Sequence, residues 1–361
     1  MKITEIQIGH LPIPLLKTFK TALRTIDQIE CLVVRMKTDS NLIGWGDSAP
    51  TAVITGDTTE SIKGAISHIR PLLLGQNILD IETIGQKIQN SMVGNFSAKA
   101  ALDMAVYDLL AKSYQVPLYQ LLGGFRNQLT TDYTISIDDP EVMAKESQEM
   151  VSQGFKILKT KVGSAVQTDI QRLCAIREAV GPEIKILVDA NQGWKPKEAV
   201  NAVRLLQQAG VNLEFVEQPV KREDFEGLRY VREHIDIPVV ADESAFSPQD
   251  VLRLVKMHAV DGINIKLMKC GGIYQALKMV AIAESADITC MVGSMMEGPI
   301  GVTAIAHLAM AKSIITDVDL DAPLFCKEYP VKGGIIYKGA HLTLPEKPGL
   351  GVEPDVTRIR F

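Results

Sequence analysis

The chain has 361 residues, more than a single hydrophobic core usually supports, so we expect one large domain and a smaller one. Hydrophobic residues make up 46% and charged residues 22%, and a net charge of −5 without a basic run argues against nucleic-acid binding. Five scattered cysteines with no CxxC pair argue against a disulfide framework or a thiolate zinc site, and no apolar run is long enough to span a membrane. We therefore expect a folded protein of the reducing cytoplasm.

The first residues alternate between polar and apolar side chains, which is typical of a strand and unlike a signal peptide. Up to about residue 124 the pattern predicts further strands, a turn at Trp45-Gly46 and an alanine-rich helix over 97–112. Gly123 and Gly124 end this segment. We interpret residues 1–124 as a separate α+β domain.

After residue 130 the sequence repeats a short apolar run, a polar turn and a helical stretch. Eight such runs lie at 132–136, 157–162, 184–191, 213–218, 239–243, 262–266, 288–293 and 314–319. Amphipathic segments such as 197–209 and 247–257 separate them, the second opening with Ser247 and Pro248 as a helix start. The repeat predicts an α/β protein with a (β/α)8-type barrel over residues 125–324. The tail, residues 325–361, is rich in Gly and Pro, and we expect it to pack back against the N-terminal domain.

Barrel enzymes carry their catalytic groups at the carboxyl ends of the strands. Asp189, Glu217 and Asp242 end three consecutive runs at separations of 28 and 25 residues, which puts their carboxylates at equivalent heights. One such acid could simply cap a helix, but three together need a shared cation, and oxygen ligands suit Mg²⁺. Asn191 and Glu243 follow closely, where they could orient the metal ligands.

Lysines end the second and sixth runs. Lys159 and Lys161 alternate onto one side of the second strand, and we expect their repulsion to lower a lysine pKa towards the range of a base. Lys266 ends the sixth run, opposite the second strand in an eight-stranded barrel. Lys161 and Lys266 would then face each other across a substrate held at the metal, one removing an α-proton and the other delivering one.

The chain resembles the enolase superfamily, in its muconate-lactonizing-enzyme-like subgroup. The resemblance spans nearly the whole sequence and rests on Trp45-Gly46-Asp47, Leu122-Gly123-Gly124, Lys159-Thr160-Lys161, Asp189, Glu217, Asp242 and Lys266. It implies an α+β capping domain built from the N-terminal part and the C-terminal tail. It also implies that two loops, around 16–25 and 49–57, close over the site and set specificity.

The subgroup uses the same lysines for several reactions, so the lysines alone do not choose among them. No histidine ends a catalytic strand, since His234, His258 and His307 lie in predicted helices, which disfavours the histidine-base branches. The last run ends in Asp319 and Asp321, which look like the paired acids that bind the free α-ammonium in dipeptide epimerases. The alternative is that these two acids cap a helix or loop.

The resemblance favours a dipeptide epimerase of the L-Ala-D/L-Glu type, with one Mg²⁺ per subunit and a small unblocked dipeptide as substrate. The segment 19–25 looks like the corresponding loop of L-Ala-D/L-Glu epimerases, which makes Arg24 a candidate partner for an acidic substrate side chain. Arg24 could instead bind a carboxylate of the capping domain. Met296 would supply an adaptable apolar wall, so the second residue of the dipeptide could be hydrophobic instead of acidic. An o-succinylbenzoate synthase or an N-succinylamino-acid racemase is the alternative. We further expect a homo-oligomer.

Overall fold

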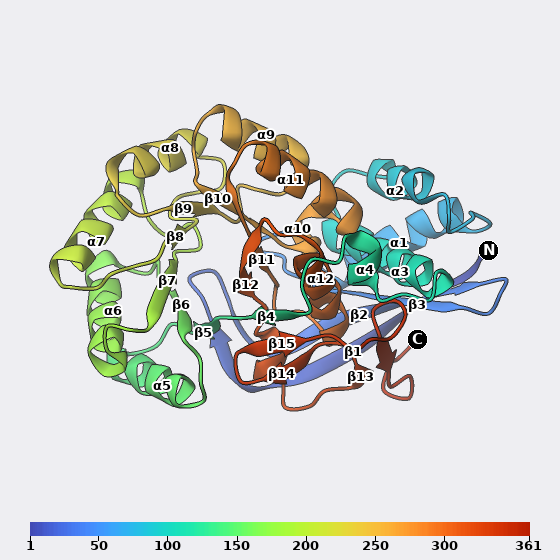
Figure 1. Cartoon of the computed structure of the whole chain (residues 1–361), viewed down its shortest axis with the longest axis horizontal. Coiled ribbons are helices and arrows are strands. Elements are labelled where there is room, and N and C mark those ends of the chain that lie inside the picture. The colour runs from blue at the N-terminus through green and yellow to red at the C-terminus, as the bar shows by residue number, and fades with distance from the viewer.

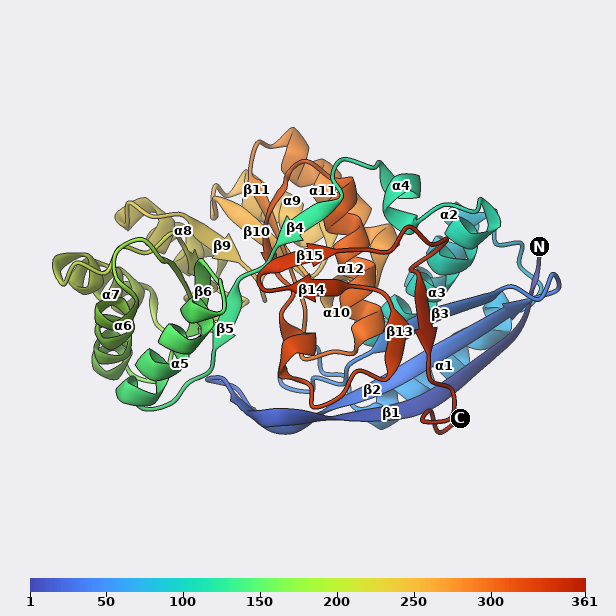
Figure 2. The same cartoon turned by 60° about the horizontal axis from the view of Figure 1, so that its bottom comes forward.

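The computed structural model describes all residues from Met1 to Phe361 and places a barrel beside an antiparallel sheet covered by helices (Figure 1). The N-terminal part pairs three antiparallel strands in the order β1-β2-β3. Its elements are β1 (Ile3–Lys20), β2 (Thr25–Thr38), β3 (Ile43–Ser48), α1 (Thr59–Leu73), α2 (Ile81–Asn90), α3 (Phe96–Ser113) and α4 (Leu118–Leu122). The long β1–β2 ribbon runs beneath the rest of the molecule in the turned view (Figure 2).

The predicted turn at Trp45-Gly46 is wrong, because both residues lie inside β3. The glycine is needed there for close packing against α3, and a Cβ on Gly46 would lie 2.0 Å from the carbonyl oxygen of Ala101. Nearly every residue of α3 is buried, including the polar Lys99, Asp103 and Asp108, because this helix lies between the sheet and the barrel. The predicted helix over 97–112 falls within it.

The predicted barrel is confirmed as eight parallel strands in the order β12-β11-β10-β9-β8-β7-β6-β5. Each strand lies within its predicted run: β5 (Tyr133–Ile135), β6 (Ile157–Lys161), β7 (Lys185–Asp189), β8 (Val216–Glu217), β9 (Val239–Ala241), β10 (Gly262–Ile265), β11 (Thr289–Gly293) and β12 (Ile315–Asp319). The first and last strands share no ladder. The backbone nitrogen of Asp132 donates to the carbonyl of Val318 at 3.0 Å, which nearly closes the barrel.

Helices between the strands form an outer layer, visible as the arc from α5 to α9 in Figure 1. They are α5 (Pro140–Ser152), α6 (Val166–Val180), α7 (Pro196–Gln208), α8 (Phe225–His234), α9 (Pro248–Lys256), α10 (Leu267–Cys270), α11 (Ile273–Ser285) and α12 (Pro299–Ala311). The predicted start of α9 is confirmed, since Ser247 Oγ accepts from the Asp250 nitrogen at 3.1 Å. A 3₁₀ turn, η1 (Ala322–Phe325), follows β12 in place of an eighth α-helix.

The tail lies against both the barrel and the N-terminal part. It contains β13 (Val331–Gly333), β14 (Ile336–Lys338), β15 (His341–Thr343) and β16 (Val352–Pro354), and β15 pairs with β4 (Gln128–Thr130). His10 and Arg360 exchange backbone hydrogen bonds, and the Leu350 nitrogen donates to Asp108 Oδ1 at 2.8 Å. These contacts support the expected packing of the tail, whereas the domain boundaries at 124 and 324 stay a prediction.

Two buried carboxylates join the N-terminal part to barrel helices. Asp47, on β3, lies beside the backbone nitrogens of Ile300 and Gly301 at the start of α12 and accepts from the Cys31 thiol at 3.2 Å. Asp103, on α3, accepts from those of Ile273 and Tyr274 at the start of α11. Burial raises the pKa of Asp47 to about 7 and that of Asp103 to about 8. Asp103 satisfies nitrogens that a helix start leaves without partners, and Asp47 lies next to two more of them.

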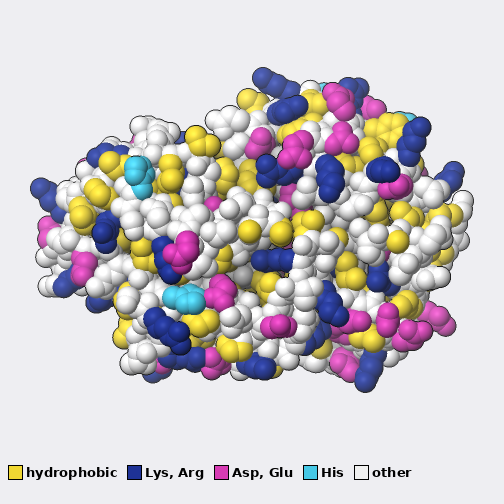
Figure 3. Space-filling view, turned by 180° about the vertical axis from the view of Figure 1, so that it is seen from behind, with side chains coloured by type: hydrophobic (Ala, Val, Ile, Leu, Met, Phe, Trp, Pro, Cys, Tyr) yellow, Lys and Arg dark blue, Asp and Glu magenta, His cyan; other side chains and the backbone are white.

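The largest hydrophobic core packs the barrel strands against their helices and continues into the contact with the N-terminal part, and a second core lies between the β1–β2 ribbon and α1 to α3. A separate small cluster of Leu187, Phe215, Val240 and Met291 joins neighbouring barrel strands. Lysines, arginines and acids are interspersed on the face shown in Figure 3. All five cysteines are free thiols. None of the helices is both long and apolar enough to cross a bilayer.

Candidate active site

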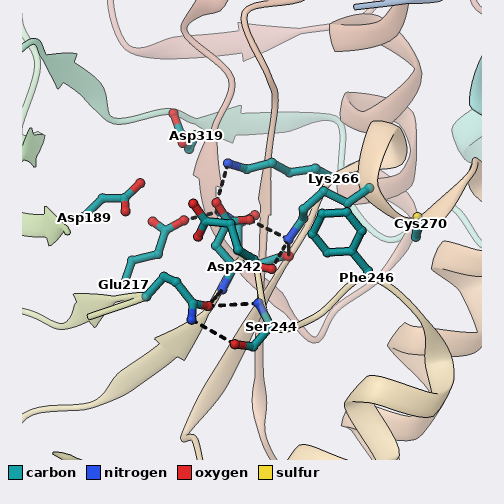
Figure 4. A network of polar contacts seen from close by, with 12 residues as sticks. Asp189, Glu217, Asp242, Ser244, Phe246, Lys266, Cys270 and Asp319 are labelled. Atoms are coloured by element: carbon teal, nitrogen blue, oxygen red, sulfur yellow. Dashed lines mark hydrogen bonds and ion pairs between the residues drawn. The ribbon is translucent and has the colours of Figure 1, made fainter. Parts of the chain in front are cut away.

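Three buried carboxylates converge at the carboxyl ends of β7, β8 and β9 (Figure 4). Asp189 and Glu217 end β7 and β8 and lie opposite each other in the strand register, and Asp242 directly follows β9. One oxygen from each of the three lies within 4.8 Å of the others. The structure therefore brings together the three acids that the sequence assigned to a metal.

Neighbouring side chains hold these carboxylates in place. The Asn191 Nδ2 donates to Asp189 Oδ2 at 3.2 Å and to Glu243 Oε1 at 3.3 Å, which agrees with the orienting position expected of both. The Asn264 Nδ2 donates to Glu217 Oε1 at 2.8 Å. Asn191 has a positive φ of 41°, a conformation that is costly without glycine and that accumulates at functional sites.

The predicted lysines all contact the acids, but Lys159 is more deeply buried than Lys161 and Lys266. Lys159 is fully buried, and its Nζ lies 2.5 Å from Glu217 Oε2 and 2.7 Å from Asp319 Oδ2. Lys161 pairs with Asp189 at 2.6 Å, and Lys266 pairs with Asp242 at 2.8 Å (Figure 4). Lys161 ends β6 and Lys266 follows β10, and three strands separate β6 from β10 in either direction around the barrel.

The expectation that neighbouring lysines lower a lysine pKa is wrong for two of them. Burial alone would lower the pKa of Lys159, but Asp319, Glu217 and Asp189 outweigh it and raise that pKa well above its usual value. Burial would also lower the pKa of Lys266, but Asp242 outweighs it and raises that pKa. The sequence argument counted the repulsion between lysines and omitted the acids beside them.

A second group of acids lies on the other side of Lys159. Asp132, Asp319 and Asp321 also place one oxygen each within 4.8 Å of one another. Burial and the neighbouring Asp319 raise the pKa of Asp321 to about 7. The sequence analysis did not identify Asp132, which precedes β5 and whose two carboxylate oxygens accept no hydrogen bond. The sequence did offer one signal: Asp132 stands just before the first barrel strand, and that strand lies beside the last one when the barrel closes.

The sequence analysis also missed Lys269, on the short helix α10. Its side chain is fully buried, and Nζ contacts Asp242 and donates to the Asn264 carbonyl at 2.8 Å. Asp242 therefore has lysines on both sides. Burial alone would raise the pKa of Asp242, but Lys266 and Lys269 hold it well below its usual range.

A narrow pocket of about 50 Å³ opens above the three carboxylates. Many predicted site residues line it: Arg24, Lys161, Asn191, Lys266, Met296, Asp319 and Asp321. The two expected loops contribute Phe19, Thr21, Arg24 and Ile54, although most of the first one belongs to the ends of β1 and β2. Lys159 and Glu243 do not line it. No histidine lies in its wall, and His258 lies two residues beyond α9.

Arg24 is the candidate for recognising a substrate side chain. Its guanidinium is largely buried, which lowers its pKa to about 10. It donates to Thr51 Oγ1 at 3.4 Å, and no protein carboxylate lies within ion-pair distance. The alternative that Arg24 binds an acid of the N-terminal part is therefore not what the structure shows.

The three carboxylates suit a hard divalent cation. Glu217 Oε2 and Asp242 Oδ1 are buried, lie near lysine ammoniums and accept no well-aligned hydrogen bond. All donor atoms are carboxylate oxygens, with no thiolate or imidazole among them. The donor set fits Mg²⁺, with Asn191 and Asn264 keeping the acids oriented.

Known proteins share this arrangement over the full chain. An L-Ala-D/L-Glu epimerase of Clostridium acetobutylicum is 50% identical over 98% of this chain and 99% of its own length. The substrate-liganded L-Ala-D/L-Glu epimerase structure from Bacillus subtilis superposes with a TM-score of 0.97 at 48% identity, covering 98% and 99% of the two chains. A dipeptide epimerase from Enterococcus faecalis, complexed with Mg and L-Leu-L-Tyr, gives a TM-score of 0.95 at 46% identity, covering 98% and 100%.

Two family models divide the chain between them. Residues 3–123 match the N-terminal domain of mandelate racemase and muconate lactonizing enzyme, and residues 142–358 match the enolase C-terminal domain-like model. The first match contains the antiparallel sheet, and the second contains β6 to β12, which carry the predicted metal ligands and lysines. The chain belongs to the mandelate racemase and muconate lactonizing enzyme family of the enolase superfamily.

Proposed function

We propose that this protein is a Mg²⁺-dependent dipeptide epimerase that inverts the α-carbon of the C-terminal residue of an unblocked dipeptide. The observation that carries the proposal is the placement of Lys161 and Lys266. They come from opposite strands, line one pocket and lie above three acids fit for a cation. Two bases on opposite faces of one carbon are what inversion by proton transfer requires.

We assign one Mg²⁺ per subunit to Asp189, Glu217 and Asp242. When bound, the cation supplies positive charge beside the substrate carboxylate, which favours the negative charge that develops when the α-proton leaves. It would also compete for the carboxylate oxygens that raise the pKa of Lys159 and Lys266. Asn191 and Glu243 keep the ligands oriented during turnover.

The two lysines divide the proton transfer. One neutral Nζ takes the α-proton from its face, and the ammonium of the other delivers a proton to the opposite face. For the reverse reaction the roles exchange, so each lysine serves one enantiomer. Lys159 stays buried beneath the pocket, where it neutralises acids of both groups and reaches substrate only through them.

We place the substrate's free ammonium at the second group of acids. Asp319 and Asp321 line the pocket, and Asp132 lies behind them. Lys159 is the one lysine paired with this group, so three carboxyl groups face one resident positive charge. A dicarboxylate such as an N-succinyl amino acid would bring further negative charge to the same place, which disfavours the alternative reactions.

The test is α-proton exchange in D₂O with Lys161→Ala and Lys266→Ala. Both variants should lose epimerization of L-Ala-L-Glu, and each should exchange deuterium into only one epimer, opposite for the two variants. Proton NMR of the α-hydrogen measures both reactions. Exchange of the same epimer by both variants contradicts the two-face assignment.

A substrate comparison separates the competing reactions. The wild-type protein should turn over free dipeptides and lose most activity on their N-acetyl or N-succinyl forms. Equal or better turnover of an N-succinyl amino acid would favour the racemase. Exhaustive chelation should abolish exchange and Mg²⁺ should restore it, with elemental analysis giving the metal content.

A further inference from the structure

A second pocket is lined by Glu243, the residue that follows Asp242 in the chain. It has a volume of about 310 Å³ and is bounded by Thr55 and Phe96 of the N-terminal part and by Arg222, Glu223, Glu243 and Phe246 of the barrel. We call it the Glu243 pocket. It shares no residue with the narrow pocket that holds Lys161 and Lys266.

Glu243 connects this second pocket to the metal ligands. Its side chain is 2% exposed, Oε1 accepts from Asn191 at 3.3 Å, and Oε2 accepts no hydrogen bond from the protein. Asn191 in turn donates to Asp189 and lines the substrate pocket. The contact between Asn191 and Glu243 is therefore a partition with the substrate pocket on one side and the Glu243 pocket on the other.

Charge and size suit a hydrated cation. The carboxylates of Glu223, Glu243 and Asp250 face the pocket, and the one cationic side chain, Arg222, pairs with Glu223 at 2.6 Å and lies over the Phe246 ring. The pocket has room for several waters, and Mg²⁺ sheds its waters reluctantly. The substrate pocket is smaller, and a bound dipeptide would occupy it.

We propose that the Glu243 pocket is the route by which the divalent cation reaches and leaves Asp189, Glu217 and Asp242, with Glu243 Oε2 as the first protein ligand. The proposal rests on the metal dependence proposed above. Each ligand then has its own pocket: the dipeptide enters and leaves beneath the β1–β2 loop, and the cation enters and leaves between Thr55 and Glu223. Metal exchange then does not require the dipeptide to leave.

The experiment follows metal release from intact protein. Wild-type protein is loaded with Mn²⁺, saturated with dipeptide at epimeric equilibrium and mixed with excess EDTA, and bound manganese is measured after timed gel filtration. Glu223→Trp places a bulky side chain at the exposed mouth of the pocket and should slow release about tenfold. Glu226→Trp, on an exposed position of α8 outside the pocket, is the matched control and should leave release unchanged.

Glu243→Gln keeps the shape of the side chain and removes the carboxylate that would bind the cation. It should slow Mn²⁺ association about tenfold, with or without dipeptide. Equal release rates for Glu223→Trp and Glu226→Trp, or unchanged association in Glu243→Gln, overturn the route. Manganese stoichiometry and epimerization by the wild-type protein report on the proposed function separately, so a wrong route leaves that function standing.

Discussion

Arg24 is the basic side chain of the substrate pocket without an acidic partner. Lys161 and Lys266 each pair with a carboxylate of the metal group, whereas the guanidinium of Arg24 meets only a threonine hydroxyl. A largely buried, unpaired guanidinium is costly unless a ligand supplies the missing charge. We therefore expect Arg24 to favour a substrate with an acidic side chain over an apolar dipeptide such as the L-Leu-L-Tyr bound by the Enterococcus faecalis relative.

Replacing Arg24 by Met should separate acidic from apolar substrates. Because a charge-assisted hydrogen bond is lost, we expect kcat/KM for L-Ala-L-Glu to fall about 100-fold and that for L-Ala-L-Leu to change less than about threefold. Steady-state polarimetry measures both. Lys20→Met, an exposed base on the same loop, is the control and should affect neither substrate. An equal loss of kcat/KM on both substrates would mean that Arg24 maintains the structure of the loop and does not recognise the acidic side chain.

Asp321 gives a second test at the level of one side chain. Asp321→Asn should reduce kcat/KM for free dipeptides about tenfold or more, and should reduce that for N-acetyl dipeptides far less, because only the free ammonium needs the charge. Asp317→Asn, on the strand that precedes Asp321 and outside the substrate pocket, controls for damage to β12. Equal losses on free and blocked dipeptides would remove Asp321 from substrate recognition.

Side chains at strand ends could be predicted from the sequence, because parallel strands bring their carboxyl ends to one place. Asp189, Glu217, Lys161 and Lys266 follow from that rule alone. Asp132 and Lys269 do not, since Asp132 precedes its strand and Lys269 belongs to a one-turn helix after Lys266. Their positions depend on the seam of the barrel and on the turn after β10, which no repeat in the sequence encodes.

At the level of elements, the packing of β3 on α3 fixes the sheet to the helix that lies against α10, α11 and α12 of the barrel. Gly44 and Gly46 let the two backbones approach, and the Trp45 nitrogen between them donates to Asp108 at 2.9 Å. A turn was predicted at Trp45-Gly46 because glycine often marks one. Its real role, close contact with a helix distant in sequence, leaves no local pattern.

Gly46→Ala should destabilise the fold. The new Cβ would collide with the Ala101 carbonyl, and overpacking of this kind costs about 1–3 kcal/mol. Urea unfolding followed by circular dichroism measures the change. Gly64→Ala is the matched control, because Gly64 lies inside α1 with open space around it and alanine there should stabilise by about 0.5–1 kcal/mol. Similar effects of both substitutions would show that the contact is easily relieved.

Across the whole molecule, Asp47 and Asp103 tie the loop-bearing sheet to helices that follow the catalytic strands. The start of α11 comes soon after Lys266, and the start of α12 comes soon after Met296. These two contacts, which we call the joint, therefore hold the N-terminal part and its two loops in a fixed position relative to Lys266 and Met296. Both acids are buried without a cationic partner, so the joint should respond to pH.

Stability should fall as pH rises through the window set by Asp103. Its pKa is about 8 in the folded protein against 3.8 in an unfolded chain, so between these values the folded state holds a proton that the unfolded state lacks. The stabilisation is complete below the lower value and is lost towards the upper one. Asp103→Asn keeps an acceptor for both nitrogens and should flatten this slope in urea titrations. The exposed Asp236→Asn should preserve the slope, and equal slopes in both variants would contradict the assignment.

Lys159 has a consequence for how such a protein can change over evolution. One fully buried ammonium lies between the acids assigned to the cation and those assigned to the substrate amine, in contact with Glu217 and Asp319 at once. A substitution in either group alters the charge that Lys159 must balance in the other, so their effects are not additive. A lineage that exchanged its dipeptide for a blocked amino acid by losing Asp319 would inherit an altered metal site as well. New specificity at one end of this pocket therefore requires compensating change at the other.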